Sequence, residues 1–312
     1  MARKITYEKV DLLIVDGQKH HRTSLRHVLN DLSFCEIRYS SDLASVQSEF
    51  AKRMPDFMIA DANLPDGSVA KLIMDVRHYL LGANPFLPIM VMTWNPDPEL
   101  IRKMVDAGAD DILLQPTSRN LLKERIDTLT FNRKPFIVAA RYIGPDRRSI
   151  PRNESQTVPL IEVPNTLNAC ATGRVDLVKI DRAIYDMFEE VNDQKLYRNA
   201  LHIDYTVQQV QPFLDKNSPD KKIQTHFQEI LFTAEDVARR VINSPHRHIS
   251  KLCVSLISVV TRLKQSHGEW ESKDVRLLPK LSTAIKLVFD DIENTAETAA
   301  RISDAIEHRS TA

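Results

Sequence analysis

Four polar side chains follow short apolar runs in the N-terminal part of this sequence. Asp16 follows the first run, Asp61 and Thr93 follow two later runs, and Gln115 follows the last. A carboxylate can bind a divalent cation or accept hydrogen bonds, and a hydroxyl or an amide can donate a hydrogen bond to a ligand. These residue types could form one polar binding site, provided that the fold brings the four side chains together.

The elements that must position these residues form an alternating pattern between Val10 and about Leu129. Apolar runs alternate with amphipathic segments, which predicts a five-stranded, doubly wound parallel sheet with crossover helices. The expected strands are residues 11–15, 36–39, 56–60, 89–92 and 111–114, and the expected helices lie near 21–32, 42–53, 67–81, 97–107 and 118–130. Ligands bind beyond the carboxyl ends of the strands in such sheets, so the four polar residues should share one rim.

Residues of about 9–130 resemble the receiver domain of bacterial two-component response regulators. The motifs LLIVDG, PDFMIADANLPDG, IMVMTWN and GADDILLQP carry this resemblance, because they occur in the family's order and at its spacing. The resemblance implies a flavodoxin-like fold in which an aspartate accepts a phosphoryl group from a histidine kinase or a phosphotransfer protein. It also implies an Mg²⁺ ion beside that aspartate.

Carried over to this sequence, the resemblance makes Asp61 the phosphoacceptor and Asp16 the first member of the usual acidic pair. Asn63 would give its backbone carbonyl to the metal, and Thr93 would contact the phosphoryl group. Gln115 stands where the family has a lysine. Its neutral amide should stabilise a phosphoryl transition state less than an ammonium group would, because charge-assisted hydrogen bonds are stronger.

Three further positions depart from the family's pattern. Gly17 stands where the second acid should be, so the affinity for Mg²⁺ should be weaker. Trp94 places a large ring at the mouth of the pocket, and Ile112 replaces the aromatic residue whose rotation reports phosphorylation in the family. Asp61 is therefore a phosphoacceptor, or the domain is a pseudo-receiver that serves as a docking surface.

A purely structural interpretation stays open beside these two. Asp16, Asp61 and Thr93 would then cap strand ends by accepting hydrogen bonds from loop amides.

The rest of the chain does not continue the alternation of apolar runs and amphipathic segments. We expect a receiver domain over 1–130, a basic extension and solvated linker over 131–165, and a helical bundle over 166–312. The extension contains one expected strand, residues 136–140, and a turn at 144–146. The bundle should begin with helices near 174–190 and 194–214, and Ser244-Pro245 should start a later helix.

Three histidines are further candidates for a functional role. His248 lies in a His-x-x-Lys pattern that faintly resembles the helix of histidine phosphotransfer domains, which would make the protein a two-site phosphorelay component. First-turn helical histidines in contact with solvent are the alternative. His20 and His21 could face the pocket rim, but paired histidines at a helix start are usually exposed.

Composition limits the classes of function. The 42 basic and 42 acidic residues leave no net charge to attract nucleic acid, so a DNA-binding role is unlikely on this ground. No segment is uncharged for long enough to span a bilayer, so we expect a cytoplasmic protein without a membrane partner. The sequence predicts a non-enzymatic signalling adaptor whose helical part binds a protein partner or forms a homodimer.

Overall fold

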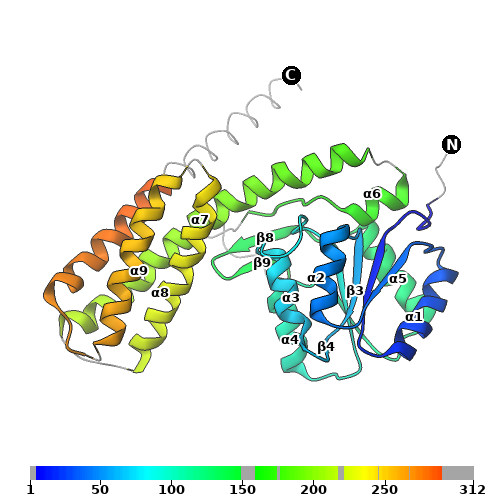
Figure 1. The fold of residues 1–312 in the computed structure, drawn as a ribbon, viewed down its shortest axis with the longest axis horizontal. Coiled ribbons are helices and arrows are strands. Elements are labelled where there is room, and N and C mark those ends of the chain that lie inside the picture. Colours follow the sequence, from blue (N-terminus) through cyan, green and yellow to red (C-terminus); the bar gives the residue numbers. More distant parts are fainter. Residues whose placement is uncertain are drawn as a thin grey trace, which may run out of the picture. The chain divides into compact units, whose positions relative to one another are not determined.

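The computed structural model describes residues 5–148, 159–173, 176–216, 221–244, 246–266 and 268–289. The chain divides into two compact units, Met1–Glu189 and Glu190–Ala312. The first unit contains a sheet with helices on both of its faces, and the described part of the second unit is helical (Figure 1).

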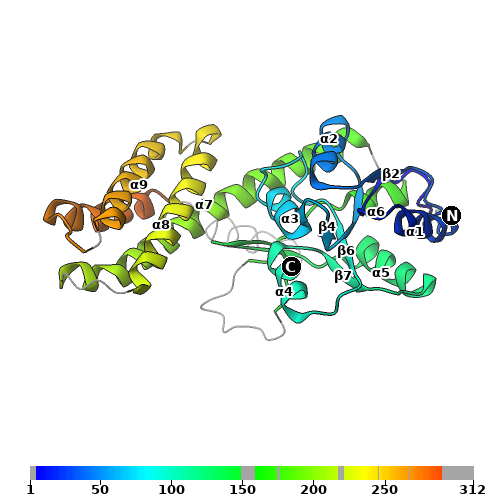
Figure 2. The ribbon, with the colours of Figure 1, turned by 60° about the horizontal axis from the view of Figure 1, so that its bottom comes forward.

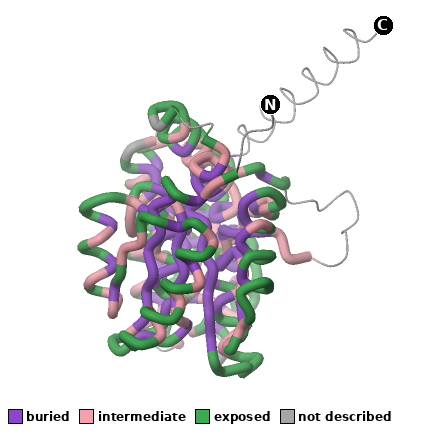
Figure 3. The backbone as a smooth tube through the Cα atoms, turned by 90° about the vertical axis from the view of Figure 1, so that its right-hand side faces the viewer, coloured by how far each residue is buried: buried purple, intermediate pink, exposed green. Residues whose placement is uncertain are grey.

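The first unit is built on a five-stranded parallel sheet. Its strands are β1 (Leu12–Val15), β2 (Ile37–Ser40), β3 (Phe57–Asp61), β6 (Ile89–Thr93) and β7 (Asp111–Leu114). They lie in the order β2-β1-β3-β6-β7, and every neighbouring pair is parallel. The fold class predicted from the sequence is confirmed, and each strand lies within one residue of its expected start and end. The three inner strands, β1, β3 and β6, are buried almost throughout, whereas the edge strands β2 and β7 are partly exposed (Figure 3).

Helices cover both faces of this sheet (Figures 1 and 2). One face packs against α1 (Lys19–Asp31), α5 (Arg119–Phe131) and α6 (Thr166–Thr172). The other face packs against α2 (Leu43–Lys52), α3 (Val69–Arg77) and α4 (Pro98–Ala107). Alternation along each strand sends successive side chains to opposite layers, so the sheet separates two apolar cores.

Side-chain caps fix where several of these helices begin. Asp42, Ser68, Asp97 and Ser118 each accept a hydrogen bond from a backbone N–H in the first turn of α2, α3, α4 and α5 respectively. Such caps satisfy donors that have no partner within the helix. Short connections with these caps hold the rim loops close to the strand ends.

A two-stranded hairpin follows α5 where the sequence predicted one strand and a later turn. It consists of β8 (Phe136–Ala139) and β9 (Tyr142–Pro145), so the turn expected at 144–146 lies instead at residues 140–141. Gly144 is needed for a close approach rather than for a turn. A Cβ atom on Gly144 would lie 2.8 Å from the Cα atom of Gly108, which ends α4.

Ion pairs attach the extension after α5 to the sheet, so its described part is not the solvated linker that the sequence predicted. Asp110 accepts a hydrogen bond from Arg77 at 2.8 Å and another from Arg133 at 2.7 Å. Both guanidinium groups also lie over the ring of Phe136, with their central carbon atoms 5.1 and 4.9 Å from its centre. The compact unit accordingly extends to Glu189, beyond residue 165, where the sequence placed the end of the linker.

One long helix, α7 (Leu177–Asp215), replaces the two helices expected near 174–190 and 194–214. Polar residues interrupt the apolar pattern near the gap between the two expected helices, and several of these residues are buried inside the second unit. Asn192 accepts a hydrogen bond from Arg240 at 3.2 Å, and Lys195 and Asn199 are fully buried. Burial of paired polar groups therefore explains a pattern that otherwise indicates a loop.

The second unit has an apolar core of its own. It is formed by α7 from Leu196 onwards, α8 (Lys221–Arg240), α9 (Ser250–Gln265) and the helical residues 272–289. The expected helix start at Ser244 is wrong, because Ser244 ends a 3₁₀ turn and α9 begins at Ser250. Pro245 lies outside the described residues. Within the described part of the chain, no helix combines the length and the apolar character needed to cross a membrane.

Candidate functional site

The four polar residues singled out in the sequence lie on one rim of the sheet. Asp16 follows β1, Asp61 ends β3, Thr93 ends β6 and Gln115 follows β7. The parallel register pairs Val15 with Ala60 and Thr93 with Leu114, so the carboxyl ends of these strands are level. The Gln115 backbone N–H donates to the Thr93 carbonyl oxygen at 2.8 Å, which extends the rim by one residue.

Loop amides orient the two carboxylates. Asp16 accepts a hydrogen bond from the Gln18 N–H at 2.6 Å, and Asp61 accepts one from the Asn63 N–H at 2.8 Å. Both bonds use the Oδ1 atom, and they agree with the capping role that the structural interpretation assigns to these residues. Asn63 starts a short strand, β4 (Asn63–Leu64), which pairs with β5 (Gly67–Ser68) beside the rim.

Burial sets the electrostatics of the pocket. It raises the pKa of Asp61, and the nearby carboxylate of Asp16 raises it further, whereas the Asn63 N–H and His21 lower it. A carboxylate in this environment interacts favourably with a cation that would cancel the repulsion between the two acids.

The Thr93 hydroxyl is buried and engaged within its own loop. It accepts a hydrogen bond from the Asn95 N–H at 3.1 Å, and only 2% of the residue is exposed. Trp94, next to it, is 48% exposed. Ile112 is partly buried against the core of the face that holds α2, α3 and α4.

Packing explains why residue 17 is a glycine and not an acid. A Cβ atom at this position would lie 2.8 Å from both Cγ and Cδ of Pro65, which is too close for any side chain without movement. Pro65 belongs to the turn between β4 and β5. The site of the missing acid is therefore closed by the proline ring.

His21 also belongs to this site, although it was not among the site residues predicted from the sequence. His20 is exposed as expected, but the side chain of His21 is only 18% exposed, and its Nδ1 atom lies 3.4 Å from Oδ2 of Asp16. The ring of Trp94 stacks on the imidazole with 5.4 Å between the ring centres. The signal available in the sequence was position alone, since His21 lies in the first turn of the helix that follows Asp16.

Asp16, His21 and Asp61 each offer one ligand atom for a cation, and these atoms all lie within 4.8 Å of one another. No other group of three His, Cys, Asp or Glu side chains in the described residues has this property. Mg²⁺ prefers oxygen ligands in nearly octahedral geometry. The set fits Mg²⁺ only in part, because a nitrogen donor is present and the second acid is replaced by Gly17.

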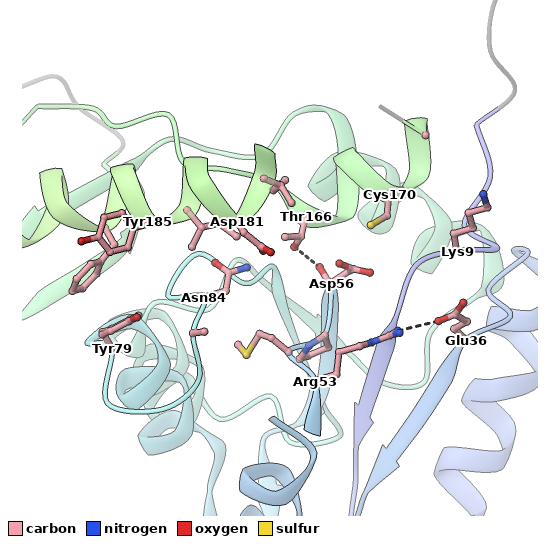
Figure 4. A pocket seen from close by; sticks show the side chains of 17 residues that line it. Lys9, Glu36, Arg53, Asp56, Tyr79, Asn84, Thr166, Cys170, Asp181 and Tyr185 are labelled. Carbon is pink, nitrogen blue, oxygen red and sulfur yellow. Dashed lines mark hydrogen bonds and ion pairs between the residues drawn. The ribbon is translucent and has the colours of Figure 1, made fainter. Parts of the chain in front are cut away.

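A cavity of about 930 Å³ lies at the opposite, amino end of the strands. It is enclosed by α6, the start of α7 and the loops before β3 (Figure 4). Its polar groups connect these elements, since Thr166 donates to the Asp56 carbonyl oxygen at 2.8 Å and the Asp56 carboxylate accepts from the Asp11 N–H at 2.9 Å. Burial raises the pKa of Cys170 to about 12, so this thiol is not a nucleophile at neutral pH.

His248 lies outside an α-helix. It belongs to a 3₁₀ turn, Arg247–Ile249, which precedes α9, and it is exposed. The first-turn helical position assumed from the sequence is therefore wrong. The imidazole is accessible to solvent, as both interpretations of His248 require.

Comparisons with known proteins match the part of the first unit that holds the five-stranded sheet. A family model described as the response regulator receiver domain matches residues 12–127. Chemotaxis protein CheY-3 of Vibrio cholerae is 25% identical over 125 residues, covering 40% of this chain and 95% of that protein. Response regulator MprA of Mycobacterium tuberculosis is 30% identical over 128 residues, covering 40% of this chain and 53% of MprA. The solved structure of CheY4 from Vibrio cholerae is 24% identical with a TM-score of 0.34, covering 37% of this chain and 94% of that chain.

Proposed function

We propose, starting from the finding that residues 12–127 are a receiver domain of the two-component response regulator family, that this chain is a non-enzymatic signal-transduction protein. Its input site is the rim that holds Asp61. Its output is the helical unit, which binds a protein partner or a second copy of the chain.

The observation that carries this proposal is the position of Asp61 at the end of the central strand β3, beside Asp16 and in register with Met92, the residue before Thr93. Asp61 acts as the phosphoacceptor in this reading. One of its carboxylate oxygens attacks the phosphorus atom of a donor, a new O–P bond forms, and the donor's leaving group departs with the electron pair of the broken bond. The donor partner is a histidine kinase or a phosphotransfer protein.

A cation and hydrogen-bond donors must reduce the repulsion between the two anions in that step. Mg²⁺ would supply this charge in a receiver site, with Asp16, Asp61 and the backbone carbonyl of Asn63 as the ligands carried over from the family. Gln115 contributes a neutral donor instead of an ammonium group, so phosphorylation is slow relative to a site that holds a lysine.

The second form of the proposal is a pseudo-receiver that signals by docking alone. Closure of the Gly17 position by Pro65 favours it, because the pocket then lacks one unit of negative charge for the metal. Ile112, packed against the core, also favours it, since an aliphatic side chain offers no aromatic ring to rotate.

Exposed apolar side chains on the second unit support its role in binding a protein. Five of them are exposed by half or more: Tyr205, Phe232, Ile242, Val254 and Leu287. A balanced net charge does not favour DNA as the partner. The position of His248 in a 3₁₀ turn does not favour a phosphohistidine there.

Incubation of the full chain with labelled acetyl phosphate tests the phosphoacceptor role, with Mg²⁺ in one series and Co²⁺ in a parallel series. We expect an acyl phosphate that hydroxylamine removes, and we expect Asp61→Asn to abolish it. Asp66→Asn is the matched control, because Asp66 is an exposed carboxylate in the same loop that caps α2. Absence of label on the wild-type chain overturns the phosphoacceptor role and leaves the docking form.

A further inference from the structure

We propose that Asp16, His21 and Asp61 form a site for a divalent ion of the later first-row transition metals, of the class of Zn²⁺ or Co²⁺, which this site binds in preference to Mg²⁺. The inference deepens the proposed function, because it names the cation of the same pocket. It rests on the geometry of the three side chains and does not require that Asp61 be phosphorylated.

The separation of the donors matches a metal site. Oδ2 of Asp16 and Nδ1 of His21 are 3.4 Å apart. Two ligands with metal bonds of roughly 2.1 Å at a tetrahedral angle lie about 3.4 Å from each other. Asp61 completes the set, with its ligand atom within 4.8 Å of the other two. A cation can therefore bridge all three after a small adjustment of the Asp61 side chain.

The imidazole nitrogen needs a partner. Nδ1 of His21 is shielded from solvent and makes no hydrogen bond to any of the described residues, because its approach to Asp16 lacks hydrogen-bond geometry. Buried polar atoms in folded proteins are almost always paired. A metal ion between Nδ1 and the two carboxylates would satisfy this atom and cancel the charge of both acids.

Neighbouring groups hold each donor in place before a metal arrives. The N–H groups of Gln18 and Asn63 fix the carboxylates of Asp16 and Asp61 through their Oδ1 atoms. Trp94 stacks on the imidazole of His21 and restricts its rotation. Such supporting contacts reduce the entropy lost when ligands are ordered around a metal.

The donor set discriminates against Mg²⁺. Mg²⁺ favours oxygen ligands and several retained waters, whereas imidazole nitrogen favours later first-row ions. A third carboxylate, which would favour Mg²⁺, is prevented at Gly17 by the ring of Pro65. His21 thus adds a nitrogen donor in a pocket that has lost an oxygen donor.

Metal titration of the full, untagged chain without a phosphodonor tests this site. Calorimetry and Co²⁺ absorption should show one equivalent of Co²⁺ or Zn²⁺ bound at least about tenfold more tightly than Mg²⁺. In a Trp270→Phe chain, Trp94 fluorescence should decrease on Co²⁺ binding, because the ring stacks on a ligand. Equal affinities for Mg²⁺ and Co²⁺ would overturn the proposal.

Two neighbouring histidines provide a matched pair of variants. His21→Gln should weaken Co²⁺ binding about 10- to 100-fold while changing Mg²⁺ binding little. His20→Gln, at an exposed position one residue away, should bind both ions as the wild type does. Tight Co²⁺ binding by His21→Gln that remains equal to wild type would contradict the assignment. Circular dichroism of both variants excludes a loss of fold as the cause.

The outcome is separable from the phosphorylation test. Selective Co²⁺ binding with no acyl phosphate refutes the phosphoacceptor role and leaves the metal site standing. An acyl phosphate on Asp61 formed with Mg²⁺, together with unselective metal binding, refutes the metal preference alone.

Discussion

At the scale of single residues, Gly17 and Pro65 belong to one packing arrangement. The proline ring occupies the space that a Cβ atom on Gly17 would need, with both ring carbons at 2.8 Å. An acid introduced at residue 17 therefore meets a steric obstacle before it can bind a cation. The two positions must change together if the pocket is to regain a carboxylate.

Gly17→Asp alone should lower the free energy of unfolding by about 1–3 kcal/mol, because overpacking forces the proline or the backbone to move. The double variant with Pro65→Ala should recover part of this loss and should bind Mg²⁺ more tightly than the wild type. Urea unfolding of the four chains in this double-mutant cycle measures the coupling. A single variant as stable as the wild type would show that the ring moves freely.

At the scale of elements, an ion pair connects α9 to the helical residues 272–289. Arg262 donates to both carboxylate oxygens of Asp274, at 2.7 and 2.6 Å. The Asp274 side chain is 4% exposed, whereas that of Arg262 is 50% exposed, so solvent weakens the pair. The hydrogen bonds from Arg262 hold the pKa of Asp274 below its ordinary value of 3.8.

Asp274→Asn should therefore destabilise the second unit by about 1 kcal/mol at neutral pH. The lowered pKa of Asp274 means that its contribution is complete above pH 3.8 and is lost as the pH falls through the lower, native-state value. The difference between variant and wild type should shrink in that acidic range. Trp270 fluorescence in a Trp94→Phe background follows this unit, since these are the chain's two tryptophans. Exposed Glu235→Gln is the control and should show no such pH-dependent difference.

At the scale of the whole molecule, the two units have separate apolar cores. Two cores lie on the faces of the sheet in the first unit, and a third lies among the helices of the second. No buried residue of the described part belongs to more than one of them. Helix α7 starts in the first unit and continues into the second.

Damage to one unit should consequently leave the unfolding of the other unchanged. Asp110→Asn removes the charge that balances the buried guanidinium of Arg77, which should cost the first unit about 3–5 kcal/mol. Unfolding followed by Trp94 in a Trp270→Phe chain should shift to lower urea. The transition followed by Trp270 in a Trp94→Phe chain should stay in place, and a matching shift of both would show that the units unfold together.

The local sequence pattern was sufficient to predict most of the first unit and the rim of its sheet. Apolar runs of strand length determined the five strands, because such runs are stable only when both faces of a parallel sheet are covered. Parallel strands then bring their carboxyl ends to one edge, so the placement of Asp16, Asp61 and Thr93 followed from their positions along the chain. The apolar stripes of the later helices likewise predicted a helical second half.

Only the tertiary structure decided features that depend on contacts between distant residues. Pro65 blocks Gly17 from another loop, Gly144 is required by its approach to Gly108, and Asn192 is buried because Arg240 donates to it. His21 joins Asp16 because the direction of a helix's first turn is set by how the helix packs on the sheet. Sequence spacing cannot determine that direction, since the rotation of a helix about its axis depends on which side chains it buries.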